Sequence, residues 1–421
     1  MNVVIVIESH FLRTPDGNVW TRAAFAHDFW KRYLEVFDGV RVVARVRDVA
    51  EPPSQHVRAD GPGVSFTAVP DYLGPWQYLT RVRNVVRAVR SAVATDDAVI
   101  LRVPSQLANC LAPAIYAARH PYAVEVVGDP WDVFGPHAVR HPLRPLLRRY
   151  SSERLKLQCE RACGAAYVTD RILQQRYPVA KGRLAVTYSS IELSNVLNEP
   201  LSVGVSDVEL TAQSHFAAPS HPLSNAPMLR MIQVGTLSQL YKGQDVAIEA
   251  LAQCRKKGLD AVLTFVGDGK FRSKLENLAA RLHVQDHVKF LGELPQGEAV
   301  QRELDRSDLF ILPSLCEGLP RALIEAMARG LPCIASTVGG IPELLPAEDL
   351  VLPGSATALT GKILEVAASP ARRSQMSARN LRRAMDFRDD VLREKRRDFY
   401  RFVRKRTEQW LKSEPAMRRC A

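Results

Sequence analysis

The chain has 421 residues, a length that suits two or three domains of ordinary size. With 46% hydrophobic and 24% charged residues, its composition excludes a largely disordered protein. Lys and Arg number 57 against 45 Asp and Glu, which gives a net charge of +12. That excess either keeps the protein soluble or attracts acidic partners: nucleic acid, anionic lipid or diphosphate-bearing substrates.

The sequence shows no sign of membrane insertion, secretion or metal binding. It contains no run of 18 apolar residues, so we expect no helix that spans a bilayer. The start MNVVIVIESHF lacks a basic n-region and a cleavage site, and it is typical of a buried first strand. Its seven scattered cysteines form no C-x-x-C pair, which predicts a reducing cytosolic location and no metal site.

The first half alternates short apolar runs with segments of helical spacing. Strands are expected at 3–7, 40–46, 98–103, 122–127 and 165–169. Helices are expected at 22–37, where Phe25, Phe29 and Tyr33 share a face, and at 81–93. This alternation predicts a parallel sheet covered on both faces.

Residues 199–228, rich in Ser, Pro and Ala, have no clear periodicity and are interpreted as a linker with an excursion loop. The alternation then resumes, with strands expected at 231–234, 261–266, 288–291, 309–312 and 332–335 and helices at 244–257, 271–282 and 320–329. We therefore expect an α/β protein with a domain at 1–198, a second at 229–390 and a basic helix within 391–421. Two doubly wound domains would face each other across a cleft.

The most informative segment is DLFILPSLCEGLPRALIEAMARGLPCIASTVGGIPE, at 308–343. A buried strand is followed by a loop that carries Glu317, and Pro320 fits the first turn of a helix that carries Glu325. The free N–H groups near Arg321, Ala322 and Leu323 would form an anion site suited to a diphosphate. Glu317 and Glu325 could each accept hydrogen bonds from hydroxyls beside that phosphate.

This segment resembles the Glu-x7-Glu motif of the GT4 family of retaining glycosyltransferases, which have the GT-B fold. Further stretches resemble the family in the same order: VGTLSQLYKGQD at 234–245, LTFVGDG at 263–269, KFLGEL at 289–294 and VGGIPE at 338–343. A lone Glu-x7-Glu would be a weak signal, but several ordered motifs over about 110 residues are specific.

The resemblance implies roles for the matched positions. Lys242 would contact the donor diphosphate, Glu317 would hold sugar hydroxyls, and Glu325 would hold the ribose. Gly235 would let the backbone approach the phosphate or the acceptor closely. Gly292 and Glu293 would lie by the base of the nucleotide. The remaining donor-side candidates in the matched motifs are Thr236, Gly267, Gly318, Leu319, Arg321 and Ala322.

The sequence departs from the family pattern at Thr236, where many members have an arginine that gives the diphosphate a second cation. The negative charge of the diphosphate would then be balanced by Lys242 and helix amides, or by a basic residue elsewhere. Gly267 opens a Gly-Asp-Gly sequence without the third glycine of a dinucleotide motif, which favours a tight turn there.

The N-terminal half offers fewer candidates, because it lacks the family's usual glycine pair and middle-strand histidine. His10, at the end of the first expected strand, and Asp129 with Asp132, after a middle strand, are acceptor-side candidates. Asp129 could act catalytically, with Lys242 and Glu317, by orienting an acceptor hydroxyl. The alternatives are a structural histidine and turn-forming aspartates beside Pro130.

The expected function is retaining, metal-independent sugar transfer from a nucleotide-diphosphate sugar to a hydroxyl of a glycan or lipid-linked acceptor, in cell-surface polysaccharide or glycolipid assembly. No cofactor is expected. The alternatives are a nucleotide-sugar epimerase on the same fold and a non-catalytic nucleotide-sugar-binding subunit. Nucleic-acid binding rests on charge alone, and no motif supports it.

The expected location is the cytoplasm, with a peripheral contact at the inner face of the plasma membrane as a further hypothesis. That hypothesis depends on the basic C-terminal helix. Its apolar residues Phe399, Phe402, Val403 and Trp410 favour packing back on the N-terminal domain. Its basic side is either solvated or attached to an anionic membrane.

Overall fold

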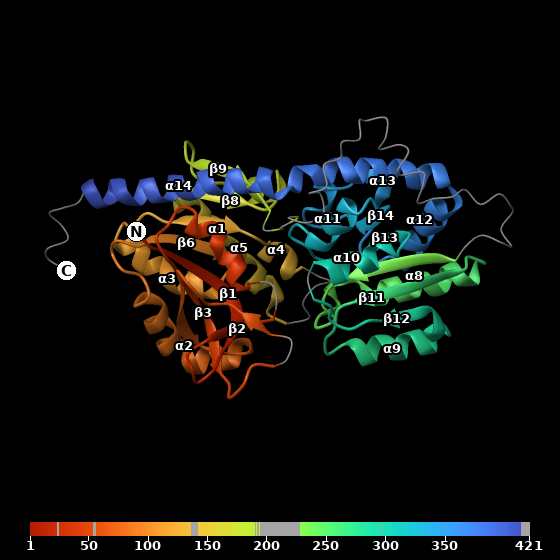
Figure 1. The fold of residues 1–421 in the computed structure, drawn as a ribbon, viewed down its shortest axis with the longest axis horizontal. Coiled ribbons are helices and arrows are strands. Elements are labelled where there is room, and N and C mark those ends of the chain that lie inside the picture. Colours follow the sequence, from red (N-terminus) through yellow and green to blue (C-terminus); the bar gives the residue numbers. More distant parts are fainter. Residues whose placement is uncertain are drawn as a thin grey trace. The chain divides into compact units, whose positions relative to one another are not determined.

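The computed structural model describes residues 1–22, 25–53, 56–135, 142–189, 191, 193, 228–295 and 297–413 (Figure 1). The chain divides into two compact units. The first comprises Met1–Pro130, Leu146–Ser189 and Leu392–Ala421, and the second Trp131–Pro145 and Ser190–Val391. The linker expected at 199–228 lies, apart from Met228, outside the described residues.

The first unit contains one nine-stranded sheet. Its parallel strands run in the order β5-β3-β1-β6-β7-β8-β9, and β2 and β4 add an antiparallel corner beside β1. The strands are β1 (Val3–Arg13), β2 (Val19–Thr21), β3 (Val40–Asp48), β4 (Val57–Arg58), β5 (Val64–Pro70), β6 (Ala98–Val103), β7 (Ala123–Val126), β8 (Gly164–Tyr167) and β9 (Leu184–Thr187).

The first strand is longer than the apolar run 3–7 indicates. After an irregularity between Val6 and His10, the chain resumes pairing with β3, and its last residues also pair with β2. Polar residues in this extension carry no alternation signal, so the sequence pattern could not show it. Conversely, the helix expected at 22–37 is confined to α1 (His27–Leu34).

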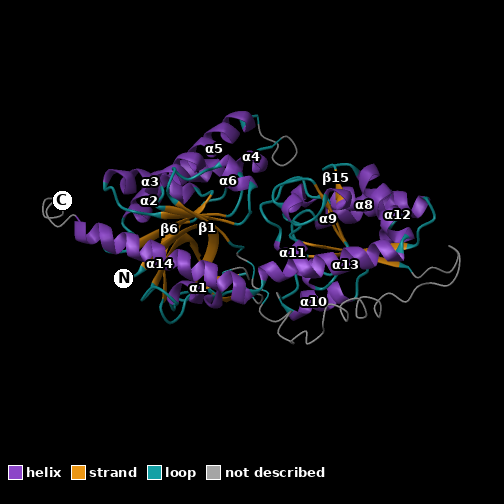
Figure 2. Ribbon diagram, turned by 90° about the horizontal axis from the view of Figure 1, so that it is seen from above, coloured by secondary structure: helices purple, strands orange, loops and turns teal. Residues whose placement is uncertain are grey.

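The helices of the first unit are α1, α2 (Gly74–Arg90), α3 (Gln106–Ala117), α5 (Arg144–Arg161, from Leu146 on), α6 (Ile172–Arg176) and, from Leu392 on, α14 (Asp389–Ser413). The short helix α4 (Pro130–Val133) begins at the last residue of this segment and continues into the second unit. Figure 2 shows the strands of the first unit between α2 and α3 on one side and α1 and α14 on the other. The Tyr400 ring of α14 stacks on Tyr33 of α1, with centroids 4.6 Å apart.

A buried polar cluster attaches α14 to this unit. Its centre is Glu125 on β7, which forms an ion pair with the buried Arg102 of β6. Three tyrosine hydroxyls donate to the same carboxylate: Tyr33 at 3.0 Å, Tyr188 at 2.9 Å and Tyr400 at 3.1 Å. The cluster satisfies a buried charge with four partners, and one of them comes from the end of the chain.

The second unit contains a six-stranded parallel sheet in the order β12-β11-β10-β13-β14-β15. Its strands are β10 (Leu229–Val234), β11 (Ala261–Val266), β12 (Val288–Phe290), β13 (Leu309–Leu312), β14 (Cys333–Ser336) and β15 (Leu350–Val351). Its helices are α8 (Gln244–Lys256), α9 (Arg272–Arg281), α10 (Glu298–Asp305), α11 (Arg321–Ala328), α12 (Ala356–Ala368) and α13 (Pro370–Ala384).

Both units therefore have the doubly wound α/β architecture expected from the alternation of strands and helices. In the second sheet the order reverses beside β10, because β11 lies on one side of it and β13 on the other. In the first sheet the corresponding reversal lies between β1 and β6. Ligands of such sheets bind outside the carboxyl ends of the strands at this switch point.

None of the helices among the described residues is both long and apolar enough to cross a membrane.

Candidate active site

The loops that follow β10 and β13 meet at the switch point of the second sheet. The loop after β10 leads through a short 3-10 turn, Leu240–Lys242, into α8. The loop after β13 carries Glu317 and leads into α11. A backbone hydrogen bond of 2.6 Å from Leu315 to the carbonyl of Tyr241 joins the two loops. Residues 75 positions apart in sequence, Lys242 and Glu317, are thereby brought together.

Lys242 and Glu317 form a mostly buried ion pair. The Lys242 Nζ donates to Glu317 Oε1 at 2.9 Å, and the side chains are 15% and 8% exposed. Burial alone would lower the pKa of Lys242, but the Glu317 carboxylate and Tyr241 raise it, so the net shift is upward. Ser314 Oγ donates to the same carboxylate oxygen at 2.8 Å. The site therefore holds a cation beside a carboxylate that accepts hydrogen bonds.

Two glycines make this close approach of side chain and loops possible. A Cβ on Gly235, directly after β10, would lie 2.6 Å from the Cδ of Lys242. A Cβ on Gly339, in the loop after β14, would lie 1.9 Å from the carbonyl oxygen of Glu317. Gly340 donates its N–H to the carbonyl of Gly318 at 2.6 Å. The glycines thus leave room for the lysine stem and for the loop that carries Glu317.

The amino end of α11 has no side-chain cap. Pro320 is the N-cap residue and makes no side-chain cap hydrogen bond, so the N–H groups of Arg321 and Ala322 are left for another acceptor. Arg321 lies 3.9 Å from Glu325 on the next turn. Burial raises the pKa of Glu325, and the charge of Arg321 opposes that rise. This helix end offers backbone donors, a guanidinium and a carboxyl together.

Gly235, Gly267 and Gly292 lie in a row along the carboxyl edge of the sheet, because they follow the neighbouring strands β10, β11 and β12. Gly235 donates its N–H to Val266 at the end of β11, and Gly267 donates to the carbonyl of Gly292 at 2.7 Å. Glu293 follows directly after Gly292. Thr236 accepts at its Oγ1 from the Ser238 N–H at 3.1 Å and so shapes the turn after Gly235.

Sequence reasoning missed the polar side chains that hold these loops. Gln233 donates to the Lys242 carbonyl at 2.7 Å, and Gln244 donates to the Thr236 carbonyl at 2.9 Å. Ser336 donates to the carbonyl of Ser314. Gln233 and Ser336 stand within otherwise apolar strands, and a polar residue in a buried strand was the available signal.

The switch point of the first sheet is occupied by the chain's own carboxylate. Glu8 accepts at Oε2 from Ser105 Oγ at 2.9 Å and from the Leu107 N–H at 3.1 Å, at the amino end of α3. Its other oxygen accepts from Tyr72 at 3.0 Å. The donors that could hold an external anion there are therefore used internally, which leaves the second sheet as the better diphosphate site.

His10, the first acceptor-side candidate, lies inside β1 rather than at its end. Its Nδ1 is 2.7 Å from Asp71 Oδ1, and its side chain is 42% exposed. The ring is therefore accessible and already oriented by a carboxylate.

Asp129 is 2% exposed and its carboxylate has internal partners. Arg176 forms an ion pair with it, and Tyr177 donates its hydroxyl at 2.6 Å. A direct contact between Asp129 and an acceptor hydroxyl would require one of these partners to move. Asp132 lies in α4 and is half-buried.

Known proteins resemble this chain in sequence. Residues 223–383 match the family model described as glycosyl transferases group 1. The chain is 28% identical to Protein CapJ of Staphylococcus aureus over 80% of this chain and 79% of that protein. It is 34% identical to the putative colanic acid biosynthesis glycosyltransferase WcaL of Salmonella typhimurium, over 40% of this chain and 42% of that one.

Solved structures resemble the chain over almost its whole length. Sucrose-phosphate synthase from Thermosynechococcus elongatus matches with a TM-score of 0.66 at 18% identity, over 95% of this chain and 98% of that one. The Anabaena protein Alr3699/HepE, solved in complex with UDP-glucose, matches with a TM-score of 0.61 at 18% identity, over 98% and 100%. At these identities the likeness shows the fold, the two-domain α/β arrangement named GT-B.

Proposed function

We propose that the chain, whose residues 223–383 match the model of glycosyl transferases group 1, transfers a sugar from a nucleotide-diphosphate sugar to a hydroxyl acceptor, with retention and without a metal ion. The observation that carries the proposal is the Lys242–Glu317 pair beside the uncapped amino end of α11, at the switch point of the second sheet. One cation, one acceptor carboxylate and free backbone amides are what a sugar diphosphate needs.

In this proposal the donor diphosphate lies between Lys242 and the N–H groups of Arg321 and Ala322. As the bond to the anomeric carbon breaks, negative charge grows on the departing diphosphate. A lysine already held in place and amides fixed by a helix stabilise that charge without rearranging. Glu317, oriented by Lys242 and Ser314, then accepts hydrogen bonds from the sugar hydroxyls.

Arg321 supplies the second cation that Thr236 cannot. It stands at the first position of α11, and its Nε is buried with no hydrogen-bond partner among the described residues. Its guanidinium contacts Glu325 only at 3.9 Å, so it retains donors for a phosphate oxygen. Glu325, one turn further along the helix, is placed to accept from the two ribose hydroxyls. The second positive charge thus comes from the helix instead of the loop after β10.

The acceptor side is assigned to the first unit, where His10 is accessible and oriented by Asp71. The relative WcaL is named for colanic acid biosynthesis, and HepE was solved with UDP-glucose. These names support transfer during assembly of a cell-surface polysaccharide, with a glycan or lipid-linked acceptor.

The test is to incubate the full chain with a panel of nucleotide-diphosphate sugars and to follow nucleotide release with and without a mixture of glycan and lipid-linked acceptors. A transferase releases the nucleotide faster when its acceptor is present and forms a glycosylated product. An epimerase would change the sugar without acceptor, and a binding subunit would release nothing. Either of the last two results would overturn the proposal.

A further inference from the structure

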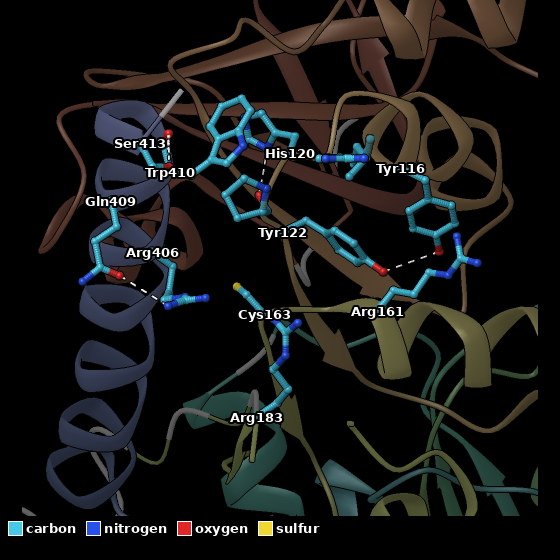
Figure 3. A pocket seen from close by; sticks show the side chains of 13 residues that line it. Tyr116, His120, Tyr122, Arg161, Cys163, Arg183, Arg406, Gln409, Trp410 and Ser413 are labelled. Carbon is cyan, nitrogen blue, oxygen red and sulfur yellow. Dashed lines mark hydrogen bonds between the residues drawn. The ribbon is translucent and has the colours of Figure 1, made fainter. Parts of the chain in front are cut away.

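A second candidate site lies in the first unit, at the opposite edge of its sheet from Glu8 and His10. It is a hollow of about 490 Å³, a volume within the range of small-molecule sites. Its lining residues precede the strands β7, β8 and β9 or belong to α14 (Figure 3). It is therefore at the amino ends of the strands, where this fold does not place its reacting groups.

Four arginines line the hollow, and no acidic residue does. Arg119 precedes β7, Arg161 precedes β8, Arg183 precedes β9, and Arg406 comes from α14. Among the described residues none of the four forms an ion pair with a carboxylate. The nearest polar side-chain contact of Arg406 is Gln409 Oε1, at 3.4 Å.

Other exposed arginines of the same unit do have acidic partners. Arg13 pairs with Asp48 at 2.7 Å, Arg58 with Asp60 at 3.1 Å and Arg393 with Glu35 at 2.9 Å. The four guanidinium groups in the hollow, which have no carboxylate partner within the described part of the chain, therefore differ from the ordinary surface of this unit. Their mutual repulsion would be relieved by a bound anion.

Two of these arginines, Arg183 and Arg406, act electrostatically on Cys163 at the floor of the hollow. Burial raises the pKa of the Cys163 thiol to about 11, and Arg406 and Arg183 oppose that rise. Figure 3 shows both guanidinium groups directed toward Cys163 from different elements. They therefore converge on one position at the bottom of the hollow.

The remaining wall is aromatic. Trp410 of α14 lies 4.5 Å from the His120 ring, measured between centroids, and the rings of Tyr116 and Tyr122 are 5.9 Å apart. Arg161 lies 4.6 Å from the centroid of the Tyr116 ring, so its guanidinium is held against that wall. Guanidinium donors beside aromatic rings match a phosphate group attached to an apolar or aromatic body.

We propose that this hollow is a binding site for a phosphate-bearing ligand, separate from the donor and acceptor sites. Phosphate oxygens accept from Arg183 and Arg406, and the body of the ligand lies against Trp410. Because α14 contributes one wall and the strand ends the other, binding joins the C-terminal helix more firmly to the sheet. The ligand is either a soluble phosphate ester or a phosphate headgroup of a lipid.

The test is isothermal titration of the full chain with inorganic pyrophosphate. It uses the Lys242→Ala background, so that the diphosphate site of the second unit contributes little. We expect one site, which the double variant Arg183→Gln/Arg406→Gln weakens by at least about tenfold, since each charged hydrogen bond to phosphate accounts for roughly that factor. The charge-conserving Arg406→Lys should retain most of the affinity.

The matched control is Arg90→Gln/Lys405→Gln, which removes two exposed positive charges from the same unit without touching the hollow. It should change the Kd less than about threefold. Equal weakening in both double variants, or no binding to the Lys242→Ala parent, would overturn the proposal. Thermal melting confirms that each variant is folded.

A second experiment, with lipid vesicles, distinguishes a lipid headgroup from a soluble phosphate ester as the ligand. Phosphatidylcholine vesicles with phosphatidic acid, or with phosphatidylglycerol as the control for charge alone, are sedimented with the chain and with Arg183→Gln/Arg406→Gln at a salt concentration that releases the chain from phosphatidylglycerol. If only the parent chain binds phosphatidic acid and pyrophosphate releases it, the ligand is a lipid headgroup. If both bind alike while the titration separates them, the ligand is a soluble phosphate ester.

Discussion

At the scale of single residues, Lys242 is the side chain on which the donor site depends most. Lys242→Ala removes the one lysine that is buried against Glu317 and leaves that carboxylate without its cation. The value of kcat/KM for transfer should fall by an amount equivalent to about 2–4 kcal/mol of lost transition-state stabilisation. This is the loss expected when one preorganised donor to a developing oxyanion is removed. The control Lys256→Ala, at the far end of α8, should leave kcat/KM unchanged. Comparable kinetics in the two variants would contradict the role of Lys242.

Glu325 gives a prediction with a defined pH dependence. Burial raises the pKa of Glu325 above that of an exposed glutamate, so the folded chain holds this proton at pH values where the unfolded chain has lost it. Its contribution to stability therefore falls as pH rises above that value. At pH 7 the melting temperature of Glu325→Gln should equal or exceed that of the wild-type chain. Near pH 4 the two melting temperatures should become equal.

The same variant should bind the nucleoside diphosphate about tenfold more weakly, because the amide replaces a charged acceptor for the ribose hydroxyls. Binding is measured by titration calorimetry at pH 7. An unchanged Kd would remove the ribose role from Glu325, whatever the melting curves show.

Residue types at the donor site could be predicted from the sequence, whereas their partners could not. Glu317 and Lys242 stand in motifs with fixed spacing, and the order of the strands then brings them within 2.9 Å. The arginine that pairs with Asp129 is 47 residues away and comes from a different element. No local pattern encodes that contact, since it depends on which strands become neighbours in the sheet.

At the scale of elements, the attachment of α14 to the first unit makes a stability prediction. Glu125→Gln leaves the buried Arg102 without its counter-charge, and breaking such a pair costs about 3–5 kcal/mol. Tyr400→Phe removes one hydrogen bond to the carboxylate and should cost about 1–3 kcal/mol. Urea denaturation measures both losses.

The control for this pair is Tyr150→Phe, because Tyr150 is exposed and lies outside the cluster. Its stability should match that of the parent chain. If Glu125→Gln were as stable as Tyr150→Phe, the cluster would not hold α14 to the sheet.

Elements buried on both sides were the easiest to predict. The strands at 98–103, 261–266 and 309–312 have the bounds that their apolar runs indicate. The helices α5, α12 and α13 were not anticipated. Most exposed positions of α5 and α13 carry arginine and other polar residues, so their apolar stripes are narrow. Tertiary contacts, rather than a strong apolar period, fix such helices.

At the scale of the whole molecule, the net charge of +12 predicts an electrostatic contribution to membrane binding. Exposed basic residues of α14 include Lys395, Arg401, Lys405 and Lys412. Each gains roughly 1 kcal/mol near an anionic surface, and salt screens that gain. The chain should sediment with phosphatidylglycerol vesicles at low salt and be released at high salt. Equal binding to neutral vesicles would exclude this mechanism.

We propose that the donor site of the second unit serves a sugar transfer that retains the anomeric configuration and needs no metal ion. The most direct measurement is proton NMR of the product formed from an α-linked nucleotide sugar, in the presence of a chelator. The account predicts an α-linked product formed at an undiminished rate, and none from Lys242→Ala/Glu317→Ala. A β-linked product, or activity that the chelator abolishes and manganese restores, would contradict it.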